Sequence, residues 1–413
     1  MNARRLTTPV NEFARYLRTE TVGGIVLLVA TAIALIWANL PWAEAYQAMR
    51  TTVVGPAALH LDLTLAEWAT DGLLAIFFFV VGLELKRELV IGELSSKSQA
   101  LLPVAAALGG MIVPAGLALA VSWGSPGFEQ AWAIPVATDI AFALGVLALA
   151  GSALPVGARV FLLGLAVADD LGAIVVIAVL FSSGLDLLAL GAVVLAAALY
   201  WWLQRKRVRA WWIYVPLGVA TWIAVHEAGI HATIAGVLLG LLTRVRADRG
   251  EEYAPALRLE HRLQPWSAGL CVPVFALFAA GVPIGAEALR AVVNEPVALG
   301  VVVGLLFGKI VGIFGSSWLV IRLTPASRPR GLSWRDLAAV SMLGGVGFTV
   351  SLLIAELSLA DQGPLLETAK AAVLVASAAA SIIGAALLVR RGRVHAANGD
   401  DDTPDDDRST PSG

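Results

Sequence analysis

Apolar stretches of about 20 residues alternate along this chain with short segments rich in charged residues, proline or glycine. Because a helix needs about 20 apolar residues to cross the hydrocarbon core of a bilayer, each stretch predicts a membrane-spanning helix. We expect twelve spans, at residues 21–40, 68–85, 101–123, 131–150, 160–181, 187–203, 212–226, 230–243, 264–282, 297–321, 337–357 and 368–389. The predicted fold class is therefore an all-α membrane protein with both chain ends on one side.

The composition agrees with this class. Of the 413 residues, 58% are hydrophobic and only 15% are charged, whereas about a quarter of the residues in soluble domains are charged. We predict a single twelve-span domain over residues 21–392, a cytoplasmic segment at 1–20 and a disordered acidic cytoplasmic tail at 393–413. The net charge of -2 gives no indication of a nucleic-acid partner.

The positive charges are distributed unequally between the two sides of the predicted bundle. Cytoplasmic loops concentrate Lys and Arg, and if the N-terminus is cytoplasmic, 25 of the 29 Lys and Arg residues lie on that side. Only Arg50, Arg290 and Lys370 fall on the other side, and Lys309 falls inside a span. We therefore expect both termini in the cytoplasm.

The segment between the first two spans contains LHLDLTL, residues 59–65, in which apolar and polar positions alternate. This period of two predicts a short strand, as one half of an external hairpin at about residues 45–65. The unpaired edge of such a strand can bind a second copy of the chain. A homodimer is therefore one interpretation, and an ordinary loop is the other.

Four ionisable residues stand near the centres of predicted spans, where a charge costs about 2.5–3.5 kcal/mol. They are Asp139, Asp169, Asp170 and Lys309. Small residues recur every four positions on the fifth and tenth spans, as Gly164, Ala168 and Gly172 and as Gly300, Gly304, Gly308 and Gly312. Such stripes allow close helix packing in lipid. We therefore expect these spans to contact each other, Asp169 to pair with Lys309, and Asp170 to face Asp139.

Two spans are interrupted near their midpoints. In the fourth span Pro135 removes a backbone donor, and Thr138 and Asp139 are good caps for a new helix; the eleventh contains LGGVG. Half-helix ends leave free carbonyl and N–H groups that can bind ions or counter charges. The fourth and eleventh spans are the middle members of two triplets, spans 3–5 and spans 10–12. The two triplets cross the membrane in opposite directions. The pattern predicts an inverted repeat with broken crossing helices 4 and 11 around a midplane site.

The blocks VGLELKREL, ATDIAFALGVLAL, DDLGAI, GIHATIAG and LGGVGFTVS, in this order and spacing, resemble the NhaA family of sodium/proton antiporters from about residue 11 to 392. That family is itself an established example of inverted repeats with broken helices. The resemblance implies a twelve-span antiporter of the bacterial inner membrane, without a resident cofactor. The chain is therefore expected to be a transporter and not an enzyme.

The resemblance also implies roles for the intramembrane residues. Asp170 and Asp169 match the ion-binding pair, with Asp170 the direct cation ligand. Thr138 is a further oxygen ligand, so the expected metal ligands are Asp170, Asp169 and Thr138. Asp139 lies at the same site and balances the N-termini of the half-helices, while Lys309 balances the opposing C-termini.

The chemistry of buried carboxylates suits exchange. Na⁺ and Li⁺ are hard cations that prefer oxygen ligands, and burial disfavours a bare carboxylate, so protons and cations compete for the same oxygens. We expect export of Na⁺ and Li⁺ in exchange for protons, which serves pH homeostasis and salt tolerance. The resemblance further implies that Asp169 takes up a proton as it releases Lys309, so that two protons move per cation and transport is electrogenic. The alternative is a sodium-coupled solute symporter of related fold, which needs a larger cavity.

A second group matches family positions associated with pH sensing. It consists of Glu84, Arg87, Glu88, Glu260, His261 and His231. Gln264 stands where the family often has another histidine. We expect pH regulation at these residues; ordinary interfacial salt bridges and a packed histidine are the alternatives.

Overall fold

The structure is a computed structural model that describes residues 9–57, 61–151, 154–182, 184–248, 251, 253–329 and 331–397. The side chains of residues 9–21, 93 and 97 are outside this description. The part of the predicted N-terminal segment before residue 9 and the part of the predicted tail after residue 397 also lie outside the described residues.

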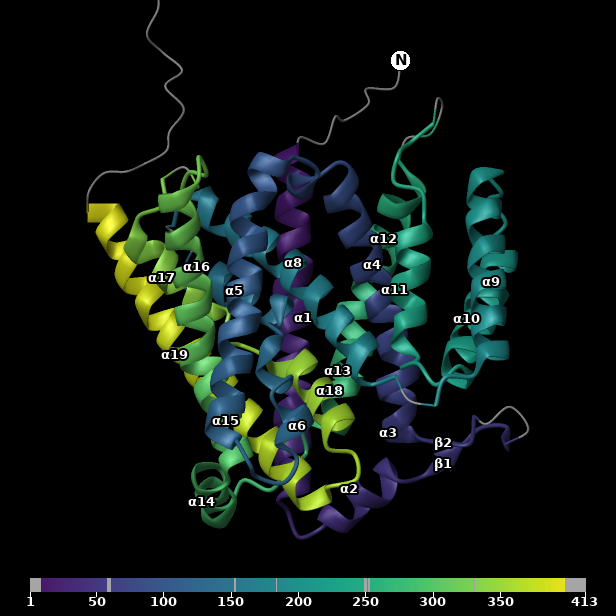
Figure 1. Ribbon diagram of the computed structural model, residues 1–413, viewed down its shortest axis with the longest axis horizontal. Coiled ribbons are helices and arrows are strands. Elements are labelled where there is room, and N and C mark those ends of the chain that lie inside the picture. The colour runs from purple at the N-terminus through teal and green to yellow at the C-terminus, as the bar shows by residue number, and fades with distance from the viewer. Residues whose placement is uncertain are drawn as a thin grey trace, which may run out of the picture.

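Helices make up almost all of the regular structure (Figure 1). In chain order they are α1 (Pro9–Ala38), α2 (Ala43–Arg50), α3 (Leu65–Glu67), α4 (Leu74–Val90), α5 (Lys97–Ser122), α6 (Phe128–Ala131), α7 (Ile140–Ala150), α8 (Val156–Leu180), α9 (Leu187–Arg205), α10 (Trp211–Glu227), α11 (Thr233–Leu242), α12 (Pro255–Trp266), α13 (Val272–Ala279), α14 (Ala286–Asn294), α15 (Pro296–Val303), α16 (Lys309–Leu323), α17 (Trp334–Leu343), α18 (Phe348–Ser358) and α19 (Gly363–Ala397). Wider π-helical turns at Trp68–Leu73, Ser267–Cys271 and Gly304–Gly308 join α3 to α4, α12 to α13 and α15 to α16.

Each of the twelve predicted spans coincides with a helix or with helices in series. Within the described residues, seven helical stretches are long and apolar enough to cross a membrane, and the bent pairs α1–α2 and α17–α18 raise this number to at most nine. The remaining predicted spans correspond to α10, to the ten-residue α11 and to α12 with α13. The chain is thus an all-α membrane protein, as the sequence predicted.

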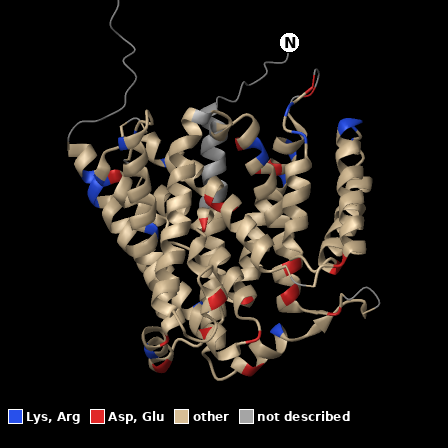
Figure 2. Cartoon of the chain, viewed as in Figure 1, with Lys and Arg blue, Asp and Glu red and all other residues tan. Residues whose placement is uncertain are grey.

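The start of α1 and the end of α19 lie at the same end of the molecule (Figure 1). Figure 2 shows that most of the visible Lys and Arg residues lie toward this end. The opposite end carries α2, α14 and an antiparallel strand pair, β1 (Val53–Val54) with β2 (Leu63–Thr64) (Figure 1). The strand predicted over 59–65 is thus limited to β2, and residues 58–60 lie outside the description.

Helix α5 organises the core around the charged residues. A Cβ added at Gly312 of α16 would lie 2.1 Å from the carbonyl oxygen of Gly109 of α5, so only glycine permits this approach. The small-residue stripe of α8 faces α5 as well, since a Cβ at Gly172 would lie 2.1 Å from the sulfur of Met111. The expectation that the two stripes pack on each other was therefore wrong. Both pack on α5, which presents glycine, alanine and proline to its neighbours.

Candidate ion-binding site

The fourth and eleventh spans are both broken, and their breaks contact each other. In the fourth, a short 3-10 turn at Ile134–Val136 is followed by an extended segment before α7; in the eleventh, Gly344 to Gly347 separate α17 from α18. The backbone N–H of Asp139 donates to the carbonyl of Val346 at 2.6 Å. The hydroxyl of Thr138 donates to the carbonyl of Gly344 at 2.9 Å. Each break thus satisfies polar backbone groups of the other, which hydrocarbon could not do.

The carboxylate of Asp139 accepts hydrogen bonds from the N-termini of two half-helices. Its Oδ1 accepts the backbone N–H of Phe142 at 3.0 Å and so caps α7. Its Oδ2 accepts the backbone N–H and the hydroxyl of Thr349 in α18, at 3.1 and 2.6 Å. A helix N-terminus carries a partial positive charge, so one carboxylate between two of them is stabilised. This geometry matches the charge-balancing role expected for Asp139.

Lys309 and Asp169 form an ion pair in the protein interior. The ammonium nitrogen lies 2.9 Å from Oδ2 and 3.2 Å from Oδ1 of Asp169, and the two side chains are 0% and 2% exposed. The same nitrogen donates to the carbonyl of Val136, where the first half of the fourth span ends. Lys309 directly follows the π-helical turn Gly304–Gly308, and such turns are frequent at functional sites. Its positive charge therefore compensates both a carboxylate and a helix C-terminus.

Asp170 is buried beside this pair but is partnered differently. Its side chain is 8% exposed and lines a cavity of ≈ 50 Å³ that is also lined by Thr138, Asp139 and Thr349. Among the described residues, none donates a hydrogen bond to Asp170 or forms an ion pair with it. The cavity continues toward Glu84 of α4. Asp170 is thus the carboxylate of this site that faces the cavity without a hydrogen-bond donor or a cation beside it in the described part of the chain.

The predicted pH-sensing residues are only partly brought together. Nη1 of Arg87 lies 3.0 Å from a carboxylate oxygen of Glu260, which is 2% exposed. Nη2 of Arg87 lies 3.4 Å from Glu88 and 3.7 Å from Glu84. This cluster joins α4 to α12. The ring of the exposed His261 instead lies 6.3 Å from the ring of Tyr253.

His231 lies in a different region from the Arg87 cluster. Its Nδ1 is 3.5 Å from Oδ1 of Asp71 in the π-helical turn before α4. Asp71 and Glu84 are separated by thirteen residues of continuous helix, which corresponds to roughly 20 Å. His231 therefore lies apart from the other candidates around Arg87.

Three contacts of buried charged side chains were not predicted from the sequence. Thr349, which hydrogen-bonds Asp139, begins the second half of the eleventh span just as Thr138 precedes that of the fourth, and this symmetry was an available signal. Lys370 of α19, expected on the outer side, is 2% exposed and pairs with Glu356 of α18.

The third unpredicted contact is an ion cluster that ties α17 to α19. The fully buried Asp336 accepts from Nε of Arg391 at 2.7 Å and lies 3.0 Å from Nε2 of His395. It also forms a capping box with Ser333 at the start of α17. No pattern in the sequence indicated that Asp336 contacts Arg391 and His395, which lie far from it along the chain.

A comparison with family models agrees with the crossed, broken helices and their buried charges. Residues 14–388 match the model described as Na+/H+ antiporter 1. The chain belongs to this family. It is 67% identical over 382 residues to the Na(+)/H(+) antiporter NhaA 1 of Saccharopolyspora erythraea, covering 92% of each chain. It is also 60% identical over 395 residues to the NhaA antiporter of Nocardia farcinica, covering 96% of this chain and 95% of that one. These alignments place the chain in the NhaA family along nearly its whole length.

Proposed function

We propose that this NhaA family member exchanges Na⁺ or Li⁺ for protons at Asp170. The observation that carries the proposal is the contrast between the buried carboxylates. Asp139 accepts three hydrogen bonds and Asp169 is paired with Lys309, whereas Asp170 faces a cavity with no partner among the described residues. A buried carboxylate without compensation must bind either a proton or a cation. Because one binding event excludes the other, loading Na⁺ releases a proton.

The site can hold a small dehydrated cation with its own oxygens. The carboxylate of Asp170 supplies charge, and the hydroxyl oxygen of Thr138 lines the same cavity. Among the described residues no group of three or more His, Cys, Asp or Glu is arranged for a metal. The carboxylate of Asp170 and the hydroxyl of Thr138 suit a monovalent cation as cargo, because such an ion needs fewer negative charges than a resident divalent metal. Asp169 joins the ligands when it leaves Lys309.

The ion pair provides a second proton in the proposed cycle. When Asp169 separates from Lys309, the partners exchange a proton with the solution as well, so two protons move against each cation. One net positive charge then crosses the membrane in the direction of the protons. Transport is electrogenic, and the membrane potential drives it. Exchange of one proton for one cation would be insensitive to the potential.

The size of the cavity supports ion exchange over the sodium-coupled symporter. Sites for organic ligands usually occupy about 300–1,000 Å³, whereas the cavity beside Asp170 measures ≈ 50 Å³. A water molecule occupies about 30 Å³ in the liquid. The cavity is therefore of a size that suits a small ion and not an organic solute.

The Arg87 cluster is placed to regulate access to Asp170. Glu84 belongs both to this cluster and to the lining of the cavity. A change of charge among Glu84, Glu88 and Glu260 alters the field at the cavity, because all three contact Arg87. We assign pH regulation to this cluster. His231 lies beside Asp71 in the turn before α4, at the other end of this helix, and its role is separate from that of the cluster.

The orientation follows from the unequal distribution of charge. The Lys- and Arg-rich end that carries the start of α1 and the end of α19 is cytoplasmic (Figure 2). Residues 21–392 form the transport domain in the bacterial inner membrane. The strand pair β1–β2 is external and joins two copies in a homodimer, since short exposed strands offer unpaired backbone groups.

The exchange is tested in liposomes that contain an internal pH indicator. External Na⁺ should raise the internal pH with wild-type protein, because protons leave as Na⁺ enters. The Asp170→Asn variant should match protein-free liposomes, whereas the control Asp361→Asn, at an exposed turn, should retain full exchange. Persistent Na⁺-dependent proton efflux with Asp170→Asn would reject the assignment. Equal rates at different imposed potentials would reject two protons per cation.

A further inference from the structure

Helix α19 is longer than a bilayer crossing requires. Its 35 residues correspond to roughly 52 Å at about 1.5 Å per residue, whereas the hydrocarbon core is about 30 Å thick. Counted from Gly363, residue 390 lies roughly 40 Å along the helix. The last three turns therefore reach the headgroup region, at the end of the molecule where α1 begins (Figure 1).

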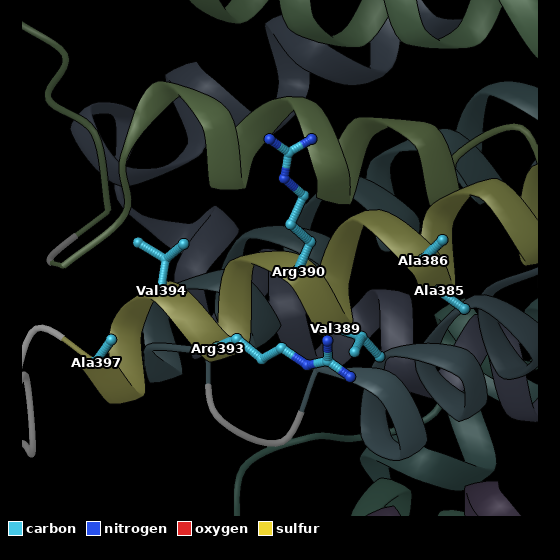
Figure 3. A pocket seen from close by; sticks show the side chains of 7 residues that line it. All are labelled: Ala385, Ala386, Val389, Arg390, Arg393, Val394 and Ala397. Carbon is cyan, nitrogen blue, oxygen red and sulfur yellow. The ribbon is translucent and has the colours of Figure 1, made fainter.

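A groove of ≈ 630 Å³ lies along these last turns (Figure 3). Its apolar lining consists of Ala385, Ala386, Val389, Val394 and Ala397, and its polar lining of Arg390 and Arg393. Ala386, Arg390, Arg393 and Ala397 are spaced by four, three and four residues, so they share one helical face. Figure 3 shows the two arginine side chains leaving α19 in different directions, with aliphatic side chains beside them.

The charges of these two arginines are available to a ligand. Arg391, between them, is engaged by Asp336 at 2.7 Å. By contrast, Arg390 and Arg393 are exposed, and no acidic side chain in the described part of the chain lies within ion-pair distance of either. Residues three apart on a helix have Cβ atoms about 5–6 Å apart. The two side chains diverge in the structure, but both are exposed, so a change of rotamer lets both guanidinium groups contact one phosphate, which arginine binds with directed hydrogen bonds.

We propose that this groove binds an anionic phospholipid, with its phosphate between Arg390 and Arg393 and an acyl chain along the aliphatic lining. Basic pockets beside membrane helices bind such headgroups. A phospholipid supplies both the negative charge and the apolar surface that the groove needs. The acidic segment after Ala397, NGDDDTPDDDRSTPSG, supplies charge but contains no aliphatic or aromatic side chain. It can neutralise the arginines but cannot cover the valines.

Binding at this place also affects the broken eleventh span. Arg391 belongs to the same turn as Arg390 and holds Asp336, which caps the start of α17. A lipid that fixes the end of α19 therefore restrains α17 through this ion pair. The bound lipid stabilises the fold as well as the groove.

The proposal is tested by thermal unfolding of the delipidated full-length protein in detergent, titrated with dioleoylphosphatidylglycerol. The lipid should raise the unfolding temperature of the wild type at low concentration. The double variant Arg390→Ala with Arg393→Ala should need about 30-fold more lipid, because each arginine near the surface contributes about fivefold. A charge-matched control, Arg246→Ala with Arg262→Ala, alters two exposed arginines outside the groove and should behave as the wild type.

Three outcomes would overturn the proposal. The first is an equal lipid requirement of the two double variants. The second is an equal effect of phosphatidylcholine or inorganic phosphate, which would remove the need for an anionic lipid. The third concerns a truncated chain that ends at Ala397 and keeps both arginines. If its unfolding temperature without lipid falls to that of the groove variant, the acidic tail is the occupant of the groove. If the alanine variant does not fold, Arg390→Gln with Arg393→Gln replaces it.

Discussion

The ammonium group of Lys309 lies 2.9 Å from a carboxylate oxygen of Asp169, and the two side chains are 0% and 2% exposed. Removing one partner of such a pair leaves a buried charge without compensation. The pair is also the only one of its kind beside the cavity, as far as the described residues show, because Asp170 has no cationic partner there. The stability of the core and the second proton of the proposed exchange would therefore depend on the same contact.

We predict that Asp169→Asn lowers the free energy of unfolding by about 3–5 kcal/mol. The reason is that Lys309 remains buried with only the carbonyl of Val136 as partner. The double variant Asp169→Asn with Lys309→Gln should recover most of the loss, since neither charge remains. Thermal unfolding in detergent measures both effects. A double variant no more stable than the single one would contradict this account.

A second prediction concerns the hydroxyl of Thr349, which donates to Asp139 at 2.6 Å. Thr349→Val should cost about 1–3 kcal/mol, because a buried carboxylate loses a hydrogen bond. It should also slow Na⁺/H⁺ exchange in liposomes, whereas Thr349→Ser should restore both properties. The control is Thr368→Val, whose exposed hydroxyl bonds only to the carbonyl of Pro364 among the described residues. If valine and serine at position 349 behave alike, the hydroxyl has no role.

A third prediction addresses the contact between α17 and α19. Arg391→Gln should lower the free energy of unfolding by about 3 kcal/mol, because Asp336 is fully buried and loses its permanently charged partner. Arg262→Gln, at an exposed position, should change it by less than about 0.5 kcal/mol. Chemical or thermal unfolding of the two variants makes the comparison. Equal stabilities would show that the buried pair does not hold the helices together.

A fourth prediction concerns a loop outside the membrane. Hydrogen bonds from Arg244 and from the backbone N–H of Asp248 lower the pKa of Glu251 from 4.5 to about 2. A depressed pKa means that this carboxylate stabilises the fold fully above pH 4.5 and progressively less as the pH falls toward 2. Wild type should therefore exceed Glu251→Gln in unfolding temperature at pH 6, and the difference should shrink at pH 4 and again at pH 3.

The control for the pH series is Glu287→Gln, at an exposed position near the start of α14, which should show no difference at any of these values. High salt should also reduce the effect at Glu251, because its partner Arg209 is largely exposed and ions screen exposed charges. A Glu251→Gln difference that grows with acidity would contradict the sign of the shift.

The sequence predicted the helical stretches and the central charges because both depend on local signals. Apolar length indicates a span, and an ionisable residue at its middle requires a partner; the pairing of Asp169 with Lys309 followed and is confirmed. The packing of α5 against the two helices that carry Asp169 and Lys309 could not be predicted in the same way. The stripe ending at Gly312 indicates close packing but does not name the neighbour, which is Gly109 of α5.

Contacts between distant side chains were also beyond the sequence. Asp336 and Arg391 are ordinary interfacial residues when read alone, and only the folded chain brings them together. The ion-binding roles of Asp170 and Thr138 remain predictions that the transport experiments test. The pH-sensing group illustrates the same limit, because motif positions united residues that the fold separates, such as His231 and Glu260.

The glycine contacts of α5 constrain how this protein can change shape. Gly312 of α16 and Gly172 of α8 meet the same helix so closely that neither can slide past it without a steric clash. Asp169 and Lys309 therefore travel with one rigid block, and rocking of that block would carry both charges together. If the block moves as one unit, the separation of Lys309 from Asp169 in the proposed cycle requires a change of side-chain conformation and not a displacement of α8 against α16.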